Sequence, residues 1–136
     1  MKLSRALADE LVAHANDELP NECCGMIAGR DGTATRVLRT ENSEGSPFMY
    51  VMEPREQLRL MEELEDAGED LLAIYHSHTR SVAYPSRTDV DLAFYSEPLY
   101  VIVSLADRQS PDIRAFTIRR NAADGEQIAE HQIESE

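Results

Sequence analysis

Apolar residues recur at helical spacing at the start of the chain. Leu3, Leu7 and Leu11 fall on one stripe, and Ser4 is placed to act as an N-cap, since its hydroxyl can accept a free backbone N–H of the first turn. This pattern predicts a helix over residues 4–18. The proline and asparagine that follow shortly afterwards are expected to end it.

Two more helices are predicted further along. Pro54 suits the first turn of a helix that runs as far as Gly68, because a proline there loses no helical hydrogen bond. Its expected inward-facing residues are Leu58, Met61 and Leu64. A third helix is predicted to open at Ser86 and to continue through about Tyr95.

Short apolar runs between these helices predict strands. Residues 23–29 are small and apolar, and Asp31-Gly32 favours a tight turn into a partner strand over 33–40. Residues 71–75 form a continuous apolar run, which is typical of a strand buried on both faces. Further strands are expected at 48–52, 99–105 and 113–119.

The order of these elements predicts an α/β fold in which a mixed β-sheet is sandwiched by helices. No repeat or linker divides the 136 residues, a length that suits one hydrophobic core. We therefore expect a single domain over residues 1–120. Residues 121–136, polar and acidic above all from Asp124 onward, are expected to be a loosely ordered tail.

The charge of the chain is unusual and excludes one class of partner. Asp and Glu number 26 against 13 for Lys and Arg, a formal net charge of -13, and Lys2 is the one lysine. Such a protein repels phosphate, so general nucleic-acid binding is not expected. The acidity has two open interpretations: an ordinary solvated surface, or adaptation to high salt, where screening weakens self-repulsion.

The cysteines and the apolar runs bear on location. Cys23 and Cys24 are adjacent and poorly placed to bridge each other, so a disulfide framework is not expected. No signal peptide is visible, and no apolar run reaches the length that crosses a bilayer. These observations favour a cytoplasmic protein without a membrane partner.

The main chemical signal is His76-Ser77-His78 followed by Asp89. Alternation along a strand puts both imidazoles on one face, where they can reach one ion, and Asp89 supplies a third ligand from the next helix. Three protein ligands leave a coordination position open, as in catalytic zinc sites. Glu22, far upstream, is a candidate for the glutamate that moves protons beside such a metal.

Each of these residues also has an ordinary structural interpretation. Ser86 and Asp89 have the spacing of a capping box, so both can simply start a helix. A closed structural zinc site would use Cys23 and Cys24 with the two histidines, but adjacent strand residues project to opposite sides. His14 and His131 lack a partner pattern and are assigned to a helix surface and to the acidic tail.

The residues together resemble the JAMM (MPN-plus) metalloprotease family. Its signature is a glutamate followed downstream by H-[ST]-H-x7-S-x2-D, and Glu22 with the segment HSHTRSVAYPSRTD at 76–89 fits it. The segment is most similar to small stand-alone bacterial peptidases of the family. The resemblance implies an MPN/JAMM domain, with a cytidine-deaminase-like sheet, over nearly the whole chain.

The resemblance also implies roles for the matching residues. His76, His78 and Asp89 would hold one Zn²⁺ per chain. Glu22 would take a proton from the attacking water and pass it to the leaving amine, and Ser86 would donate a hydrogen bond to the developing oxyanion. Ser77 is expected to form hydrogen bonds within the sheet rather than to take part in the chemistry.

The implied reaction is cleavage after the C-terminal diglycine of a ubiquitin-like sulfur-carrier protein, with release of cysteine. Removal of a ubiquitin-like modifier from lysine is the alternative, and a non-catalytic MPN scaffold is a third hypothesis. A nucleobase deaminase is disfavoured because its Pro-Cys-x-x-Cys signature is missing.

In the loop 79–85, Tyr84 could line a substrate groove and Arg80 could meet a carboxylate, or both could simply be exposed. The oligomeric state stays open.

Overall fold

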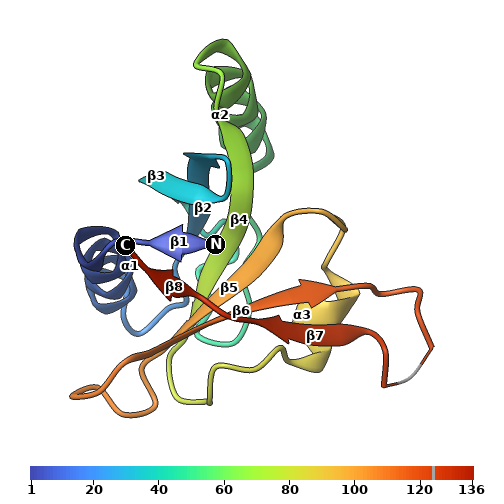
Figure 1. The fold of residues 1–136 in the computed structure, drawn as a ribbon. Helices are drawn as coiled ribbons and strands as arrows, with labels where there is room; N and C mark the ends of the chain where they lie inside the picture. The colour runs from blue at the N-terminus through green and yellow to red at the C-terminus, as the bar shows by residue number, and fades with distance from the viewer. Residues whose placement is uncertain (124) are drawn as a thin grey trace.

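One mixed sheet of eight strands organises the computed structural model, which describes residues 1–123 and 125–136. The strands lie in the order β7-β6-β5-β4-β2-β3-β1-β8, and helices flank the sheet (Figure 1). The elements along the chain are β1 (Lys2–Leu3), α1 (Arg5–Asp17), β2 (Cys24–Arg30), β3 (Thr33–Thr40), α2 (Pro54–Asp66), β4 (Asp70–His78), α3 (Arg87–Asp91), β5 (Leu99–Ser104), β6 (Asp112–Ile118), β7 (Ile128–His131) and β8 (Glu134–Ser135).

The central strand β4 runs antiparallel to β2 on one side and parallel to β5 on the other. Its residues from Ala73 to His78 are all buried, whereas Leu71 and Leu72, at the start of the predicted apolar run, are half-buried. A strand paired on both sides and covered on both faces is held rigidly. The side chains at its C-terminal end are therefore fixed in direction by the sheet itself.

The two faces of the sheet carry separate hydrophobic clusters. On one face, Leu11 and Ala15 of α1 pack with Tyr75, Val101 and other buried residues. On the opposite face, Leu60 of α2 and Val90 of α3 lie in a cluster with strand residues such as Met26, Ile74, Ile102 and Phe116. Helices thus cover both faces, which confirms the predicted sandwich.

Local sequence chemistry sets several of these boundaries as predicted. The hydroxyl of Ser4 caps α1 by accepting the backbone N–H of Leu7 at 3.2 Å. Asp31 and Gly32 both have positive φ, 51° and 78°, which is the backbone of the tight hairpin turn between β2 and β3. Glycine adopts that conformation freely, and aspartate tolerates it better than most residues.

Two predicted elements differ in the structure. The third helix ends at Asp91 rather than near Tyr95, because the backbone N–H of Tyr95 donates to the hydroxyl of Tyr100 at 3.0 Å instead of continuing the helix. Residues 48–52 do not form a strand and make one isolated bridge, from Met52 to Asn42. The side chain of Asn42 bonds the backbone of Met49 and Val51 and so replaces a partner strand.

The inward face of α2 is also rotated from the prediction. Leu58 is 62% exposed, whereas Leu60 and Leu64 are buried. Leu60 and Leu64 are four residues apart and lie above one another on one face of the helix, so they form the contact with the sheet. Met61 is half-buried at the margin of that contact.

The expected loosely ordered tail supplies two strands instead. β7 pairs antiparallel with β6, and β8 pairs parallel with β1. Two apolar residues within the polar sequence explain this, because Ile128 packs against one hydrophobic cluster and Ile133 against the other. Asp124, at which the tail was expected to become most polar and acidic, lies outside the described residues.

The sheet is strongly curled. β7 and β8 occupy its two opposite edges, yet only residues 132 and 133 separate them along the chain. Three Cα steps span at most about 11 Å, whereas eight strands in a flat sheet would extend about 34 Å. The two edges must therefore approach each other, as the neighbouring β1, β8 and β7 show in Figure 1.

In the part of the chain that the structure describes, no helix is both long and apolar enough to span a bilayer.

Candidate metal centre

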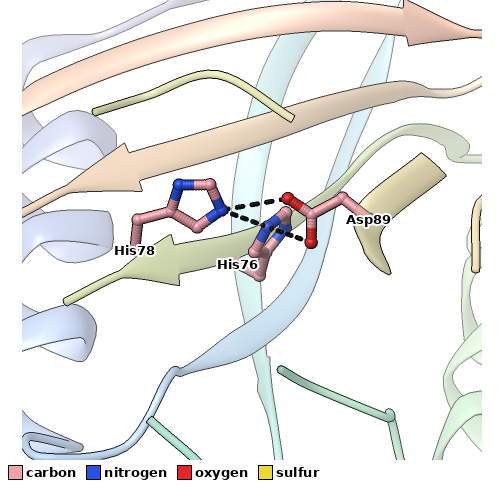
Figure 2. A group of neighbouring side chains, drawn as sticks. All are labelled: His76, His78 and Asp89. Carbon is pink, nitrogen blue, oxygen red and sulfur yellow. Dashed lines mark hydrogen bonds and ion pairs between the residues drawn. The ribbon is translucent and has the colours of Figure 1, made fainter. Parts of the chain in front are cut away.

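His76, His78 and Asp89 come together at the end of β4. The histidines share one face of the strand, while Asp89 reaches them from the first turn of α3 (Figure 2). All three are buried, with exposed fractions of 1%, 4% and 6%. One potential ligand atom from each lies within 4.8 Å of the other two.

The separations between these atoms fit ligands of a single tetrahedral ion. Nε2 of His76 lies 3.2 Å from Nε2 of His78 and 3.2 Å from Oδ1 of Asp89, and Nε2 of His78 lies 3.0 Å from Oδ2 of Asp89. Bonds of 2.0–2.1 Å at tetrahedral angles would put ligand atoms about 3.3–3.4 Å apart. The three side chains therefore have the chemistry and the spacing that a zinc ion requires.

Neighbouring groups fix the orientation of both rings. Nδ1 of His78 lies 2.8 Å from the carbonyl oxygen of Val82 and donates to it, which leaves Nε2 with a free lone pair. The ring of Tyr50 stacks on His76, with centroids 4.4 Å apart and planes 21° from parallel. Within the described residues, Nδ1 of His76 has no hydrogen-bond partner.

The protonation of the cluster follows from its burial and its hydrogen bonds. Burial alone would raise the pKa of Asp89, but the charge of His76 and the hydrogen bonds from both histidines and the Ser86 backbone outweigh it and hold that pKa well below its usual range. Burial lowers the pKa of His76. Burial also opposes the charged form of His78, but its bonds to Asp89 and Val82 leave its pKa raised. Asp89 is thus a stable carboxylate.

Asp89 caps the helix and faces the histidines at the same time. Its Oδ2 accepts the backbone N–H of Ser86 at 2.9 Å, and the hydroxyl of Ser86 accepts the backbone N–H of Asp89 at 3.1 Å. The capping box expected from the sequence is therefore present. Because the carboxylate has two oxygens, each with spare lone pairs, capping does not exclude metal binding. The Ser86 hydroxyl accepts one bond and keeps its hydrogen available to donate.

The structure places Glu22 beside this cluster. In the pairing of β2 with β4, Cys24 lies opposite His76, so continuing the antiparallel register by two residues brings Glu22 opposite His78. Glu22 is 4% exposed. Burial raises its pKa to about 8, with His78 opposing and Asp89 adding to that shift.

Backbone contacts hold Glu22 in place. Its N–H donates to the carbonyl of Ser46 at 2.9 Å, and its carbonyl accepts the side-chain N–H of Asn42 at 3.1 Å. The next residue, Cys23, is tied to β4 because its N–H donates to the hydroxyl of Ser77 at 2.8 Å. Ser77 thus bonds within the sheet, as expected. Oε1 of Glu22 finds no partner among the described residues and is free to bond a reacting group.

The competing cysteine site does not form. Cys23 packs in the hydrophobic cluster beside α1, and Cys24 packs on the opposite face of the sheet. Sγ of Cys24 bonds the hydroxyl of Thr40 at 3.2 Å, and both thiols are free rather than bridged. Adjacent residues of one strand point to opposite faces, so the two sulfurs cannot share an ion with the histidines.

An aromatic hollow of about 190 Å³ adjoins the cluster on the His76 side. It is lined by Tyr50, Val51, Met52, Pro54, Gln57, Ile74, Leu92, Phe94, Tyr95 and Tyr100. Since Tyr50 both lines this hollow and stacks on His76, the hollow opens next to the candidate ligands. In the loop after β4, Tyr84 is 54% exposed and packs edge-on against Phe116, so its ring is outside this hollow's lining.

Three residues of the site's surroundings were missed from the sequence. Tyr50 and Asn42 lie in the loop between β3 and α2, and no spacing pattern marked either of them. His14 was assigned to a helix surface but is 1% exposed, with Nδ1 2.6 Å from the hydroxyl of Tyr75. Its position three residues after Leu11, on the apolar side of α1, was the available signal. His131 is exposed and lies 3.0 Å from the Thr117 hydroxyl.

Comparison with known proteins gives relatives along nearly the whole chain. A CysO-cysteine peptidase of Mycobacterium tuberculosis is 40% identical over 124 residues, which cover 90% of this chain and 85% of that protein. A protein of Thermus thermophilus named as a probable TtuB-protein conjugate cleaving protease is 36% identical over 126 residues, covering 92% and 78%.

Solved structures agree with this result. A solution structure of a protein from Desulfitobacterium hafniense superposes with a TM-score of 0.88 at 35% identity, covering 99% of this chain and 92% of that one. A JAB1/MPN domain protein from Archaeoglobus fulgidus superposes with a TM-score of 0.62 at 19% identity, covering 99% and 98%. The second likeness shows that the fold is the predicted one.

A family model described as prokaryotic homologues of the JAB domain matches residues 4–119. That span contains the whole cluster, from Glu22 to Asp89, and the sheet that positions it. Two relatives, 40% and 36% identical to this chain, support the same assignment, so it does not depend on one comparison. The chain belongs to the prokaryotic homologues of the JAB domain.

Proposed function

We propose that this protein is a zinc-dependent peptidase that cleaves after the C-terminal diglycine of a ubiquitin-like sulfur-carrier protein and releases cysteine. The observation that carries the proposal is the buried triad of His76, His78 and Asp89 with ligand spacing, next to the buried carboxyl of Glu22. A scaffold domain needs neither a buried carboxylate between two imidazoles nor an unpartnered glutamate. Burying such groups costs free energy, and buried ionisable groups with shifted pKa values concentrate at functional sites.

The triad would hold one zinc ion through Nε2 of each histidine and the carboxylate of Asp89. When bound, zinc supplies Lewis-acid chemistry, which makes a water nucleophilic near neutral pH and polarises a carbonyl. The chain's own contribution is to fix the ligands: the sheet aims both rings, Val82 sets the tautomer of His78, and the helix cap holds Asp89.

Glu22 would act as the proton carrier. Its carboxyl has a pKa of about 8 because it is buried, and a group with a pKa near neutrality can both accept and return a proton at physiological pH. In the proposed reaction it takes a proton from the attacking water and gives it to the leaving amine. The unpartnered Oε1 is the atom that would carry the proton.

Ser86 would stabilise the oxygen on which negative charge develops. Its hydroxyl already accepts the N–H of Asp89, so the direction of its remaining hydrogen is restricted. Because that hydroxyl is held by the cap, it needs little reorganisation to donate to a carbonyl oxygen next to the triad. Pre-positioned donors of this kind give large rate effects in other hydrolases.

Two relatives support the class of substrate. The Mycobacterium tuberculosis relative is named a CysO-cysteine peptidase, and the Thermus thermophilus relative a protease of TtuB-protein conjugates. The first name supports release of cysteine from a carrier. The second favours the alternative, removal of a ubiquitin-like modifier from the lysine of a target protein. The diglycine end follows from the family resemblance, since glycine lets a backbone approach a buried site closely.

The test is intact-mass analysis of a carrier ending in Gly-Gly-Cys after incubation with zinc-loaded enzyme, beside a Glu22→Ala variant. We expect the carrier to lose one cysteine residue with the natural enzyme and to stay intact with the variant. The zinc content of both proteins is measured in parallel, and one zinc per chain is expected in each. Full hydrolysis by the variant would refute the role of Glu22.

The remaining outcomes separate the alternatives. A zinc-loaded enzyme that leaves the Gly-Gly-Cys carrier uncut but releases the same carrier from a lysine side chain would establish the modifier-removing activity. A protein that purifies without stoichiometric metal, and whose stability is indifferent to a chelator, would be a scaffold domain. Each result excludes the other two hypotheses.

A further inference from the structure

A second hollow, of about 580 Å³, is lined in part by the two residues that directly follow His78 in the chain. We call it the arginine hollow, and its lining residues are Leu19, Pro20, Pro47, Phe48, Thr79, Arg80, Leu105, Ala106 and Arg108. Two charged residues of the described chain line it, Arg80 and Arg108, and no acidic residue does. Phe48, at 76% exposed, adds an apolar surface.

The charge of this hollow is opposite to that of the protein. The chain carries a net charge of -13, and most of its arginines are engaged by acidic side chains or backbone carbonyls. Within the described residues, Arg80 and Arg108 make no ion pair. By contrast, a hollow of about 1040 Å³ between α2 and the 94–98 segment is lined by five acidic residues and no basic one: Glu62, Glu65, Glu69, Asp70 and Glu97.

The arginine hollow is built on the same segments as the candidate centre. Thr79 directly follows His78, and the backbone N–H of Leu105 donates to the carbonyl of His78 at 2.9 Å. Thr79 also donates its hydroxyl to the carbonyl of Pro47 at 3.3 Å, next to Ser46, whose carbonyl holds the backbone of Glu22. The hollow is therefore built from segments that also hold a candidate ligand and the backbone of the proposed proton carrier.

We propose that the arginine hollow binds the free α-carboxylate of the amino acid that leaves, with Arg80 as the main specificity residue and Arg108 as its support. This inference rests on the proposed function and names the leaving group that the site selects. Cα of Arg80 is two residues from that of His78 and so at most about 7 Å away. The α-carboxylate of a single leaving residue is separated from the scissile nitrogen by one Cα atom, so it must lie close to the centre.

The positive charge of the arginine hollow distinguishes between the two possible leaving groups, because only one of them carries a carboxylate next to the scissile bond. A terminal amino acid carries a carboxylate right next to the scissile bond, and arginine binds carboxylates with paired N–H donors. A lysine inside a target protein brings a long apolar stem and an uncharged backbone instead. In a chain whose net charge repels anions, the two arginines of this hollow also raise the local concentration of a carboxylate substrate.

The test compares two carriers that differ only at the terminus, one ending in Gly-Gly-Cys with a free carboxylate and one ending in Gly-Gly-Cys carboxamide. The enzymes are the natural protein, Arg80→Gln, Arg80→Gln/Arg108→Gln, and Arg55→Gln as a matched control on the exposed start of α2. All are zinc-loaded, and kcat/KM is measured for both carriers at low salt and at high salt.

We expect the natural protein to prefer the free carboxylate by roughly tenfold, as one charge-assisted arginine pair implies. The double variant should lose that preference, while Arg55→Gln keeps it. High salt should weaken the preference.

Equal cleavage of both carriers by the natural protein, or a preference that survives the double variant, would overturn this inference and leave the proposed function intact. Cleavage of neither carrier by the zinc-loaded natural protein would overturn the proposed function and this inference with it.

Discussion

Ser77 and Cys23 hold each other through two hydrogen bonds across β4 and the start of β2. The hydroxyl of Ser77 accepts the N–H of Cys23 at 2.8 Å, and the N–H of Ser77 donates to the carbonyl of Cys23 at 3.1 Å. Because Ser77 lies between the two candidate histidines and Cys23 follows Glu22, this contact sets the distance between the proton carrier and the ligands. Ser77, which has no proposed role in the chemistry, thus positions both the proton carrier Glu22 and the two histidines.

Replacing Ser77 by alanine tests this positioning. The change leaves the buried N–H of Cys23 without its acceptor, which costs about 1–3 kcal/mol of stability, and it loosens the segment that carries Glu22, just before β2. We expect a lower urea midpoint together with a fall in kcat and little change in KM. Ser77→Thr restores the hydroxyl and is expected to recover most of the activity. An alanine variant with reduced stability but full kcat would refute the positioning role.

Ser86 and Ser4 offer a matched pair, because both cap a helix through a side-chain oxygen. Ser4→Ala and Ser86→Ala are each expected to cost about 1 kcal/mol in the free energy of unfolding. Only Ser86→Ala is expected to lower kcat as well, by roughly 100-fold, since it removes the proposed oxyanion donor. Stability by urea titration and steady-state kinetics check the pair. Equal kinetic effects at both serines would assign Ser86 to capping alone.

Asp89 and Asp91 lie on the same short helix and differ in their surroundings. Asp89 is buried between two histidines, whereas the side chain of Asp91 is 65% exposed in a surface pair with Arg87. Asp89→Asn replaces a carboxylate by a neutral amide, so we expect zinc affinity to fall by at least about 100-fold. Asp91→Asn should leave it unchanged. Competition with a chelating indicator gives the affinities, and a similar loss in both variants would contradict the assignment.

His14 makes stability depend on pH. Burial lowers its pKa to about 4, with Arg39 adding to the effect, so the folded protein holds it neutral while the unfolded chain protonates it near pH 6.5. Between these values the unfolded state binds more protons. The stabilisation is therefore complete above about pH 6.5 and is lost as the pH falls towards 4, a change of about 3 kcal/mol.

Two variants isolate this contribution. His14→Leu should flatten the dependence of the unfolding free energy on pH between about 6.5 and 4, whatever it does to stability at neutral pH. Tyr75→Phe removes the hydroxyl that lies 2.6 Å from Nδ1 but keeps a buried histidine, so most of the slope should remain. An unchanged slope in His14→Leu would assign the acid sensitivity to other groups.

The acidic surface predicts a response to salt. With a net charge of -13, the folded state repels itself, and KCl screens that repulsion. We expect the free energy of unfolding to rise between low and molar KCl, and to rise less in Glu62→Gln/Glu65→Gln, which removes two exposed charges from α2. A stability that does not rise with KCl would refute adaptation to high salt and favour an ordinary solvated surface.

Much of the site could be predicted because its chemistry is local. His76 and His78 are two residues apart on a strand, and Asp89 begins the next helix, so spacing and alternation bring the three together without knowledge of the rest of the fold. Glu22 was harder, since its place depends on how β2 pairs with β4. Only the family motif identified it from the sequence.

The misplaced elements share a physical cause, which is competition from distant groups. Asn42 bonds the backbone at 49–51 in place of a strand, and the Tyr100 hydroxyl takes the N–H with which the third helix would have continued at Tyr95. The C-terminal residues look polar on average, yet Ile128 and Ile133 attach them to the two cores. The secondary-structure propensity of a short segment does not reflect its contacts with residues that are distant in the sequence.

The curled sheet also bears on aggregation. An exposed edge strand offers unpaired N–H and C=O groups to other chains, and long, flat, apolar edges are the most dangerous. Here the edges are β7, of four residues, and β8, of two, and both contain a glutamate, Glu130 and Glu134. The long apolar strands β4 and β5 are paired on both sides. The two terminal strands of the sheet therefore offer only short, charged edges, a poor template for the edge-to-edge stacking that leads to fibrils.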